Sequence, residues 1–227
     1  MGANQIFLTI DGLEEKIQTL YHLVNVEKVK NGEDLKAARA QGDLSENADY
    51  DAARDEQARI DSEIKENEAI LKSYKLINIS QEDLDKYIKK LTKEDNAAAN
   101  QLKLAEEELA KAKNEKAINN ANENVQKALE EKKALAFRLR YFVEAKIEVG
   151  SAAVSNLGKL VTIYFEDTGE TEEYKIVGSL ESNPLKGLIS NESPVGEAVL
   201  NAKVGDRLQI KSEADDYTFF IQVKSIK

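Results

Sequence analysis

The segment that decides the fold is QGDLSENADYDAARDEQ, which runs from Gln41 to Gln57. It holds six acids in seventeen residues and a glycine near its start. Long stretches of helix-forming residues run on both sides of it, and apolar residues recur there every three or four positions. They are Leu13, Ile17, Leu20 and Val24, with Leu35 and Ala38, before the segment, and Ala53, Ile60, Ile64, Leu71 and Tyr74 after it. Two such stripes flanking one polar turn predict an antiparallel helical hairpin with an acidic tip.

The residues of the turn suggest how the two helices end and begin. Gly42 is expected to adopt the left-handed conformation that commonly terminates a helix, and Ser45 is expected to cap the second helix. Gly32 lies inside the first helix and should weaken it by about 1 kcal/mol relative to Ala. Judged from their spacing alone, the acids of the tip are expected only to satisfy a helix dipole.

A second helical segment follows the hairpin. Neither Gly nor Pro occurs between Gly42 and Gly150, and Ser80 followed by three polar residues is a plausible helix start. We expect a short helix, then a second hairpin from about Asp95 to Ala145 that turns at INNANEN, residues 118–124, because Asn competes for backbone hydrogen bonds. One uninterrupted long helix is the alternative.

The C-terminal third alternates between apolar and polar residues, as strands do. Five strands are predicted in KLVTIYFED, TEEYKIVGS, KGLISNE, DRLQIKSE and YTFFIQVKS, with turns at Thr168–Gly169 and Asp215–Asp216. PVGEAVLN, which starts at Pro194, predicts a short helix capped by Ser193. The fold class is therefore α+β, a helical N-terminal part followed by a small antiparallel sheet with one short helix.

Composition limits the possible functions. Charged residues make up 33% of the 227 residues, which is typical of long exposed helices, and the formal net charge is −10. Such a charge disfavours nonspecific binding to duplex DNA, which requires Lys and Arg to neutralise phosphates. There is no Cys, so disulfides and thiolate metal sites are excluded. No signal peptide and no membrane span are expected, because no long apolar run occurs.

Several of these segments together resemble one protein family. GDLSENADYDAARDEQ is similar to the tip motif of bacterial transcript cleavage factors of the Gre (GreA/GreB) type. FLTIDGLEEKIQTL and EAILKSYKLIN resemble the entry and exit of their coiled coil, and LVTIYFEDTGETEEYKIVG and ISNESPVGEAVLNAKVGDRLQI resemble their FKBP-like C-terminal domain. The resemblance implies a coiled-coil domain at 1–79 and a polymerase-docking domain at 150–227. Residues 80–149 are left as a helical insertion, either a brace or a docking element.

The resemblance also implies a function. Gre factors bind RNA polymerase through the C-terminal domain and pass the coiled coil into the secondary channel. There they stimulate the polymerase's own hydrolysis of nascent RNA in backtracked complexes. By this resemblance the chain is not itself an enzyme. It is expected to be cytoplasmic and monomeric, to have no membrane partner and to bind no cofactor when isolated.

Roles for single residues follow from the same resemblance. Asp43 and Glu46 match the acids that help to hold a second Mg²⁺ in the polymerase active site, and their spacing of three puts both on one side of a helical turn. Tip support is implied for Gly42, Leu44, Ser45, Asn47, Asp49 and Tyr50, contact with the RNA 3′ segment for Arg39 and Arg54, and polymerase docking for Ser193 and Pro194.

Four alternatives stay open at this point. Arg39 and Arg54 would be ordinary surface cations if they only paired with neighbouring acids. The chain would be a channel-binding inhibitor if the tip entered the polymerase without promoting cleavage. Outside the family, an FKBP-like prolyl isomerase or chaperone with a coiled-coil arm, or a purely structural coiled coil, would share the same elements.

Overall fold

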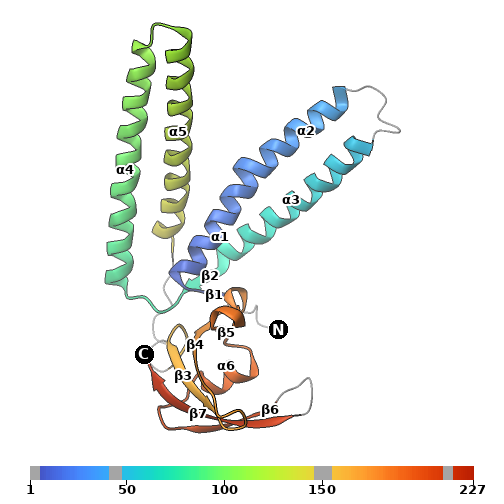
Figure 1. Ribbon diagram of the computed structural model, residues 1–227, viewed down its shortest axis with the longest axis vertical. Helices are drawn as coiled ribbons and strands as arrows, with labels where there is room; N and C mark the ends of the chain where they lie inside the picture. Colours follow the sequence, from blue (N-terminus) through green and yellow to red (C-terminus); the bar gives the residue numbers. More distant parts are fainter. Residues whose placement is uncertain (1–5, 41–47, 146–154, 212–216) are drawn as a thin grey trace. The chain divides into compact units, whose positions relative to one another are not determined.

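The computed structural model describes residues 6–40, 48–145, 155–211 and 217–227. They belong to two compact units (Figure 1). One unit holds the helical segments Glu14–Leu71 and Gln81–Ala145, and the other combines Met1–Leu13, Lys72–Ser80 and Lys146–Lys227. The three-domain division made from the sequence stays a prediction.

The first hairpin has two long helical arms. The first arm consists of α1 (Ile10–His22), a single π-helical turn η1 (Leu23–Glu27) and α2 (Lys28–Ala40), and the second arm is α3 (Ala48–Ser73). The predicted apolar stripes are buried at most of their positions, which include Ile17, Leu20, Leu35, Ala38, Ala53, Ile60 and Ile64. The predicted hairpin is therefore confirmed on both sides of its tip.

Two positions of the predicted stripes differ in the structure. Leu23 is buried and Val24 is only half-buried, because the wider π-turn begins at Leu23 and changes the phase of the helix there. Tyr74 is buried, but it belongs to a strand rather than to α3.

Polar contacts join the two arms near their middle. The Asn31 side chain is buried, and its amide donates a 2.8 Å hydrogen bond to the Ala53 carbonyl. Lys28 pairs with Asp61 at 2.7 Å, and Arg59 of α3 pairs with Glu27 of the π-turn at 2.6 Å. Exposed pairs of this kind contribute little stability each, so the buried apolar stripe carries most of the packing energy of this hairpin.

The predicted second hairpin is present, but its turn does not lie at INNANEN. α4 (Gln81–Lys111) is one continuous helix, the chain turns at residues 112–114, and α5 (Glu115–Val143) includes the whole of INNANEN. Asn114 caps α5, since its side chain accepts a 2.9 Å hydrogen bond from the Ala117 amide. The predictions of a turn at 118–124 and of a separate short helix are wrong, as is the single long helix. The hydrogen bond from the Asn114 cap stabilises a helix start at this position, and the Asn residues of INNANEN are tolerated inside the helix, where Ala121 is buried.

The sheet unit has five strands and one covering helix. In sheet order they are β5 (Leu188–Ser190), β4 (Thr171–Val177), β3 (Leu160–Phe165), β7 (Thr218–Ile226) and β6 (Arg207–Lys211). Neighbours run antiparallel except β4 and β5, which are parallel. The expectation of a wholly antiparallel sheet is corrected, because the chain crosses over between β4 and β5 through the short helices η2 (Ser179–Glu181) and η3 (Pro184–Lys186).

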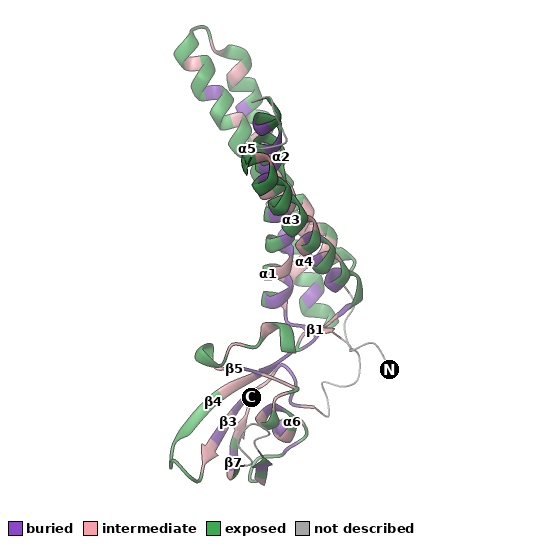
Figure 2. Ribbon diagram, turned by 90° about the vertical axis from the view of Figure 1, so that its right-hand side faces the viewer, coloured by how far each residue is buried: buried purple, intermediate pink, exposed green. Residues whose placement is uncertain are grey.

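The core of this unit lies between the sheet and α6 (Pro194–Val199), and Figure 2 shows buried residues along the strands. Fully buried side chains from both layers meet there, among them Val161, Ile163, Ile176, Val199, Ile221 and Val223. This arrangement confirms the α+β class.

A short parallel sheet that the sequence did not predict attaches the ends of the first hairpin to this unit. β1 (Ile6–Leu8) pairs with β2 (Tyr74–Leu76). Phe7 packs against the sheet core, and the Thr9 amide donates a 2.8 Å hydrogen bond to the Glu181 carboxylate. Within this unit, therefore, the chain that enters α1 is held by a residue of η2.

Candidate functional site

The predicted tip lies between the last residue of α2, Ala40, and the first residue of α3, Ala48. Six of the predicted site residues fall in this interval and lie outside the described residues. They are Gly42, Asp43, Leu44, Ser45, Glu46 and Asn47. Their roles stay predictions, while the residues on either side show what surrounds the tip.

Two cations and a phenol gather beside the tip. The Arg39 guanidinium, in the last turn of α2, lies 5.7 Å from the centre of the Tyr50 ring in the first turn of α3. Hydrogen bonds from Arg39 and then from Arg54 lower the pKa of the Tyr50 hydroxyl. Both arginines are exposed, and Tyr50 is half-buried. The two residues predicted to contact RNA, one on each arm, thus share one tyrosine.

This arrangement suits an anionic ligand. A guanidinium pairs with phosphate through two parallel hydrogen bonds, and an aromatic ring offers a face on which a base can stack. The role of Tyr50 as a shared acceptor was missed from the sequence. The signal was present, because Arg54 follows Tyr50 by four residues and so lies on the same helix face.

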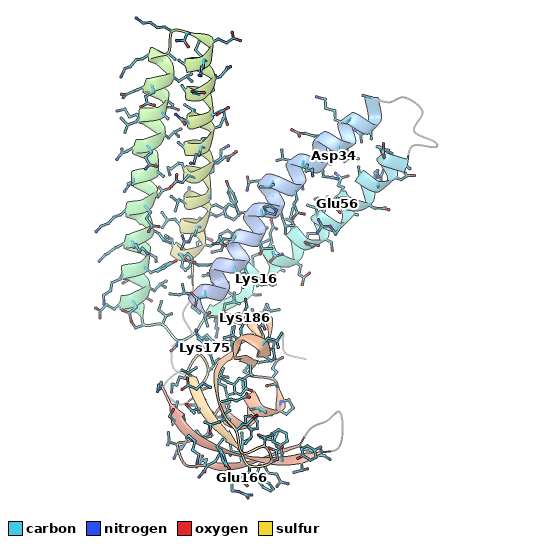
Figure 3. The ribbon with its side chains drawn as sticks, in the orientation of Figure 1. Lys16, Asp34, Glu56, Glu166, Lys175 and Lys186 are labelled. Carbon is cyan, nitrogen blue, oxygen red and sulfur yellow. The ribbon has the colours of Figure 1, made fainter. Side chains whose placement is uncertain are left out.

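An acidic groove lies between the two arms next to these residues. It has a volume of about 420 Å³, and Asp34, Asp49 and Glu56 contribute carboxylates to it, with Asn31 and four alanines completing the lining. Figure 3 labels Asp34 on α2 and Glu56 on α3. In the described part of the chain, no group of three or more His, Cys, Asp or Glu side chains is arranged to hold a metal ion. The groove disfavours phosphate, so an anion would bind at the arginines.

The second predicted element, Ser193–Pro194, starts α6. The Ser193 Oγ accepts a 3.1 Å hydrogen bond from the Gly196 amide and donates a 2.7 Å bond to the Ser190 carbonyl. Pro194 occupies the first turn and is exposed. The predicted cap is confirmed, and the docking role stays a prediction.

The surroundings of α6 give this element a fixed shape. Pro194, Glu192 and Glu197 line a hollow of about 300 Å³ beside β6. At the other end of the helix, Asn156 is buried and donates to the carbonyls of Val199 and Ala202. The element is therefore held at both ends.

Comparison with known families identifies the chain. Residues 6–76 match the family described as transcription elongation factor, N-terminal, and residues 152–227 match transcription elongation factor, GreA/GreB, C-term. The chain belongs to the Gre family of transcription elongation factors. The resemblance of the tip and sheet segments to this family is thereby confirmed. Neither match covers residues 77–151, which include the second hairpin.

Individual relatives agree with this assignment. Transcription elongation factor GreA of Acholeplasma laidlawii is 32% identical, and the alignment covers 100% of this chain and 99% of that protein. GreA of Mesoplasma florum is also 32% identical, with 99% of each chain covered. Among solved structures, GreA factor homolog 1 (Gfh1) of Thermus thermophilus is 19% identical over 99% of each chain with a TM-score of 0.31. Membership in the family rests on the two family matches and on the relatives.

Among the described residues, no helix combines the length and the apolar character that crossing a bilayer requires.

Proposed function

We propose that this Gre-family elongation factor binds RNA polymerase and stimulates the polymerase's own hydrolysis of nascent RNA in backtracked complexes. One observation carries the proposal. The N-terminal family match, residues 6–76, includes a two-armed hairpin whose connecting segment holds both Asp43 and Glu46. In this proposal the chain has no hydrolytic activity of its own and acts in the cytoplasm as a monomer.

The donor chemistry of the tip fits Mg²⁺. Asp43 and Glu46 offer hard carboxylate oxygens, and Mg²⁺ in phosphoryl-transfer sites commonly takes one or two protein carboxylates while keeping several waters. Mg²⁺ lowers the pKa of a bound water and stabilises charge on phosphate oxygens. The two carboxylates would help to hold such an ion at the polymerase active centre, and the isolated chain would bind none.

The arginines beside the tip would hold the RNA 3′ segment. Arg39 and Arg54 both hydrogen-bond to Tyr50, which limits the rotamers they sample and keeps them near the end of the hairpin. Pre-ordered donors lose less conformational entropy when they bind a phosphate. Tyr50 would therefore support RNA contact by ordering the two cations.

The Ser193–Pro194 element would contact the polymerase outside the channel. It is exposed at Pro194 and held in one conformation by the cap and by Asn156. The net charge of −10 agrees with a protein partner rather than with duplex DNA.

Purified RNA polymerase stalled in a backtracked complex with labelled RNA tests the proposal. The native chain and the Asp43→Asn/Glu46→Gln double variant are compared for polymerase binding and for RNA shortening. The proposal expects both to bind and only the native chain to accelerate cleavage. Binding without cleavage by either form would indicate a channel-binding inhibitor, and absence of binding would overturn the proposal.

A further inference from the structure

Within the helical unit, the second hairpin contacts the first where α5 meets α1 (Figure 1). The Arg138 guanidinium of α5 hydrogen-bonds to the Glu14 carboxylate of α1 and lies 2.5 Å from the Tyr87 hydroxyl of α4. Arg138 and Glu14 are about three-quarters buried, with 25% and 22% of their side-chain surface exposed. One side chain therefore joins three helices.

An aromatic cluster extends this contact along α1. The Tyr21 ring of α1 meets the Phe137 ring of α5 edge to face, with centroids 5.4 Å apart, and Phe137 lies 5.3 Å from Tyr141. The Tyr21 hydroxyl also donates a 3.4 Å hydrogen bond to the Glu130 carbonyl. Aromatic pairs in this geometry contribute about 0.5–1.5 kcal/mol beyond the area they bury.

The contact is narrow. A groove of about 470 Å³ remains between α1 and α5, lined on α1 by Ile17, Gln18, Tyr21 and His22 and on α5 by Glu131, Ala134, Leu135 and Arg138. Part of the surface between α1 and α5 therefore stays open, and the side chains that meet beside the groove carry the contact. Removing one of them should change the contact measurably.

The end of the second hairpin that touches α1 is also its best-packed end. Phe142 is fully buried and lies 4.8 Å from Tyr87, whereas the buried residues of the outer half are alanines, Ala98, Ala105 and Ala121. The buried Phe142 ring packs the C-terminal end of α5 tightly, and Phe137 and Arg138 project from this same end. The inserted hairpin thus presents a firm surface to α1.

We propose that the inserted hairpin is a strut that fixes the direction of the first hairpin through the Arg138–Glu14 and Phe137–Tyr21 contacts, with Arg138 as a positioning residue. The strut acts on α1, which leads through η1 and α2 to the acidic tip. Its consequence for RNA cleavage rests on the proposed function, but its geometry can be measured without polymerase.

The absence of Cys from the sequence makes the measurement direct. Spin labels are attached at Lys36→Cys on α2 and Lys103→Cys on α4, both of which are exposed positions. Pulsed electron paramagnetic resonance then gives the distribution of distances between the two hairpins. The strut predicts one narrow distribution, and in Arg138→Met the width roughly doubles because several orientations replace one.

Arg140→Met is the matched control. Arg140 lies two residues further along α5, but its guanidinium contacts Tyr141 of the same helix and the Glu144 that follows it. This variant should leave the distribution unchanged. Circular dichroism of each variant shows whether the helices are intact, and the charge swap Glu14→Arg/Arg138→Glu should restore the narrow distribution. An unchanged width in Arg138→Met, or an equal broadening in Arg140→Met, would overturn the strut.

The cleavage assay then tests what the strut does. Arg138→Met should bind polymerase as tightly as the native chain, while its maximal cleavage rate falls by roughly tenfold, since small misplacements of a reacting group are costly. A broadened distribution with unchanged cleavage would overturn the role in tip positioning. If the native chain itself failed to stimulate cleavage, the proposed function would fail while the distance result stood on its own.

Discussion

Asn156 allows a quantitative test of how the docking element is held. Its side chain is 5% exposed, and its amide donates to the Val199 carbonyl at 2.7 Å and to the Ala202 carbonyl at 2.8 Å. The Val199 carbonyl belongs to the last residue of α6, where a helix has no partners of its own for its C=O groups, and the Ala202 carbonyl follows the helix. Asn156→Leu keeps a branched side chain, somewhat larger than Asn, and removes both hydrogen bonds.

The expected cost follows from the two carbonyls left buried. An unsatisfied buried acceptor costs about 1–3 kcal/mol, so the pair costs about 2–6 kcal/mol. The lower half of this range is expected, because the Val199 carbonyl still accepts a 3.2 Å hydrogen bond from the Ala202 amide. A loss of that size is a large share of the roughly 5–15 kcal/mol by which domains are stable.

Hydrogen exchange of the β3 and β7 amides measures this loss. These strands lie at the centre of the sheet, so their slowest amides report the free energy of opening that unit. The full chain has two units, so one unfolding curve would not isolate the effect. Asn201→Leu, at an exposed position after the same helix, is the control and should change the free energy by less than about 0.5 kcal/mol. An equally small change in Asn156→Leu would refute the reasoning.

Further predictions concern single positions. Gly32→Ala should stabilise α2 by about 1 kcal/mol, seen as slower amide exchange there, because a Cβ at this helical position meets nothing within 4 Å. Gly196→Ala should destabilise the sheet unit, seen as faster exchange of its strands, because the added Cβ would lie 1.9 Å from the Ser190 carbonyl oxygen. In an NMR titration Tyr50 should ionise at lower pH than a free tyrosine, and Arg39→Met should move that pKa back up. Because this pKa is lowered in the folded chain, folding stability rises as the pH rises through the pKa of Tyr50 and is lost again as the pH falls. An unchanged Tyr50 titration in Arg39→Met would contradict the pairing.

The sequence predicted the elements that depend on local pattern. The apolar stripes gave both arms of the first hairpin, and alternation gave all five strands of the main sheet. Ser193 and Pro194 were predicted as the start of α6, because the cap and the first-turn proline are signals contained within a few residues.

What the sequence did not predict depends on contacts between distant segments. Strands β1 and β2 are three residues each and pair only because the hairpin brings its two ends together. The sequence placed the turn of the second hairpin at INNANEN rather than at Asn114. Composition does not reveal that Asn114 caps α5 or that Ala121 is buried inside that helix. Roles for Asp43 and Glu46 came from resemblance to a family rather than from packing or spacing.

The most direct test of the central claim, that the tip carboxylates recruit Mg²⁺ for RNA hydrolysis, is the Mg²⁺ dependence of cleavage. RNA shortening in the backtracked complex is followed over a Mg²⁺ titration with polymerase alone, with the native chain and with Asp43→Asn. The account predicts that the native chain lowers the Mg²⁺ concentration for half-maximal cleavage and that Asp43→Asn largely removes this shift. A native chain that accelerates cleavage with no change in Mg²⁺ dependence would contradict it.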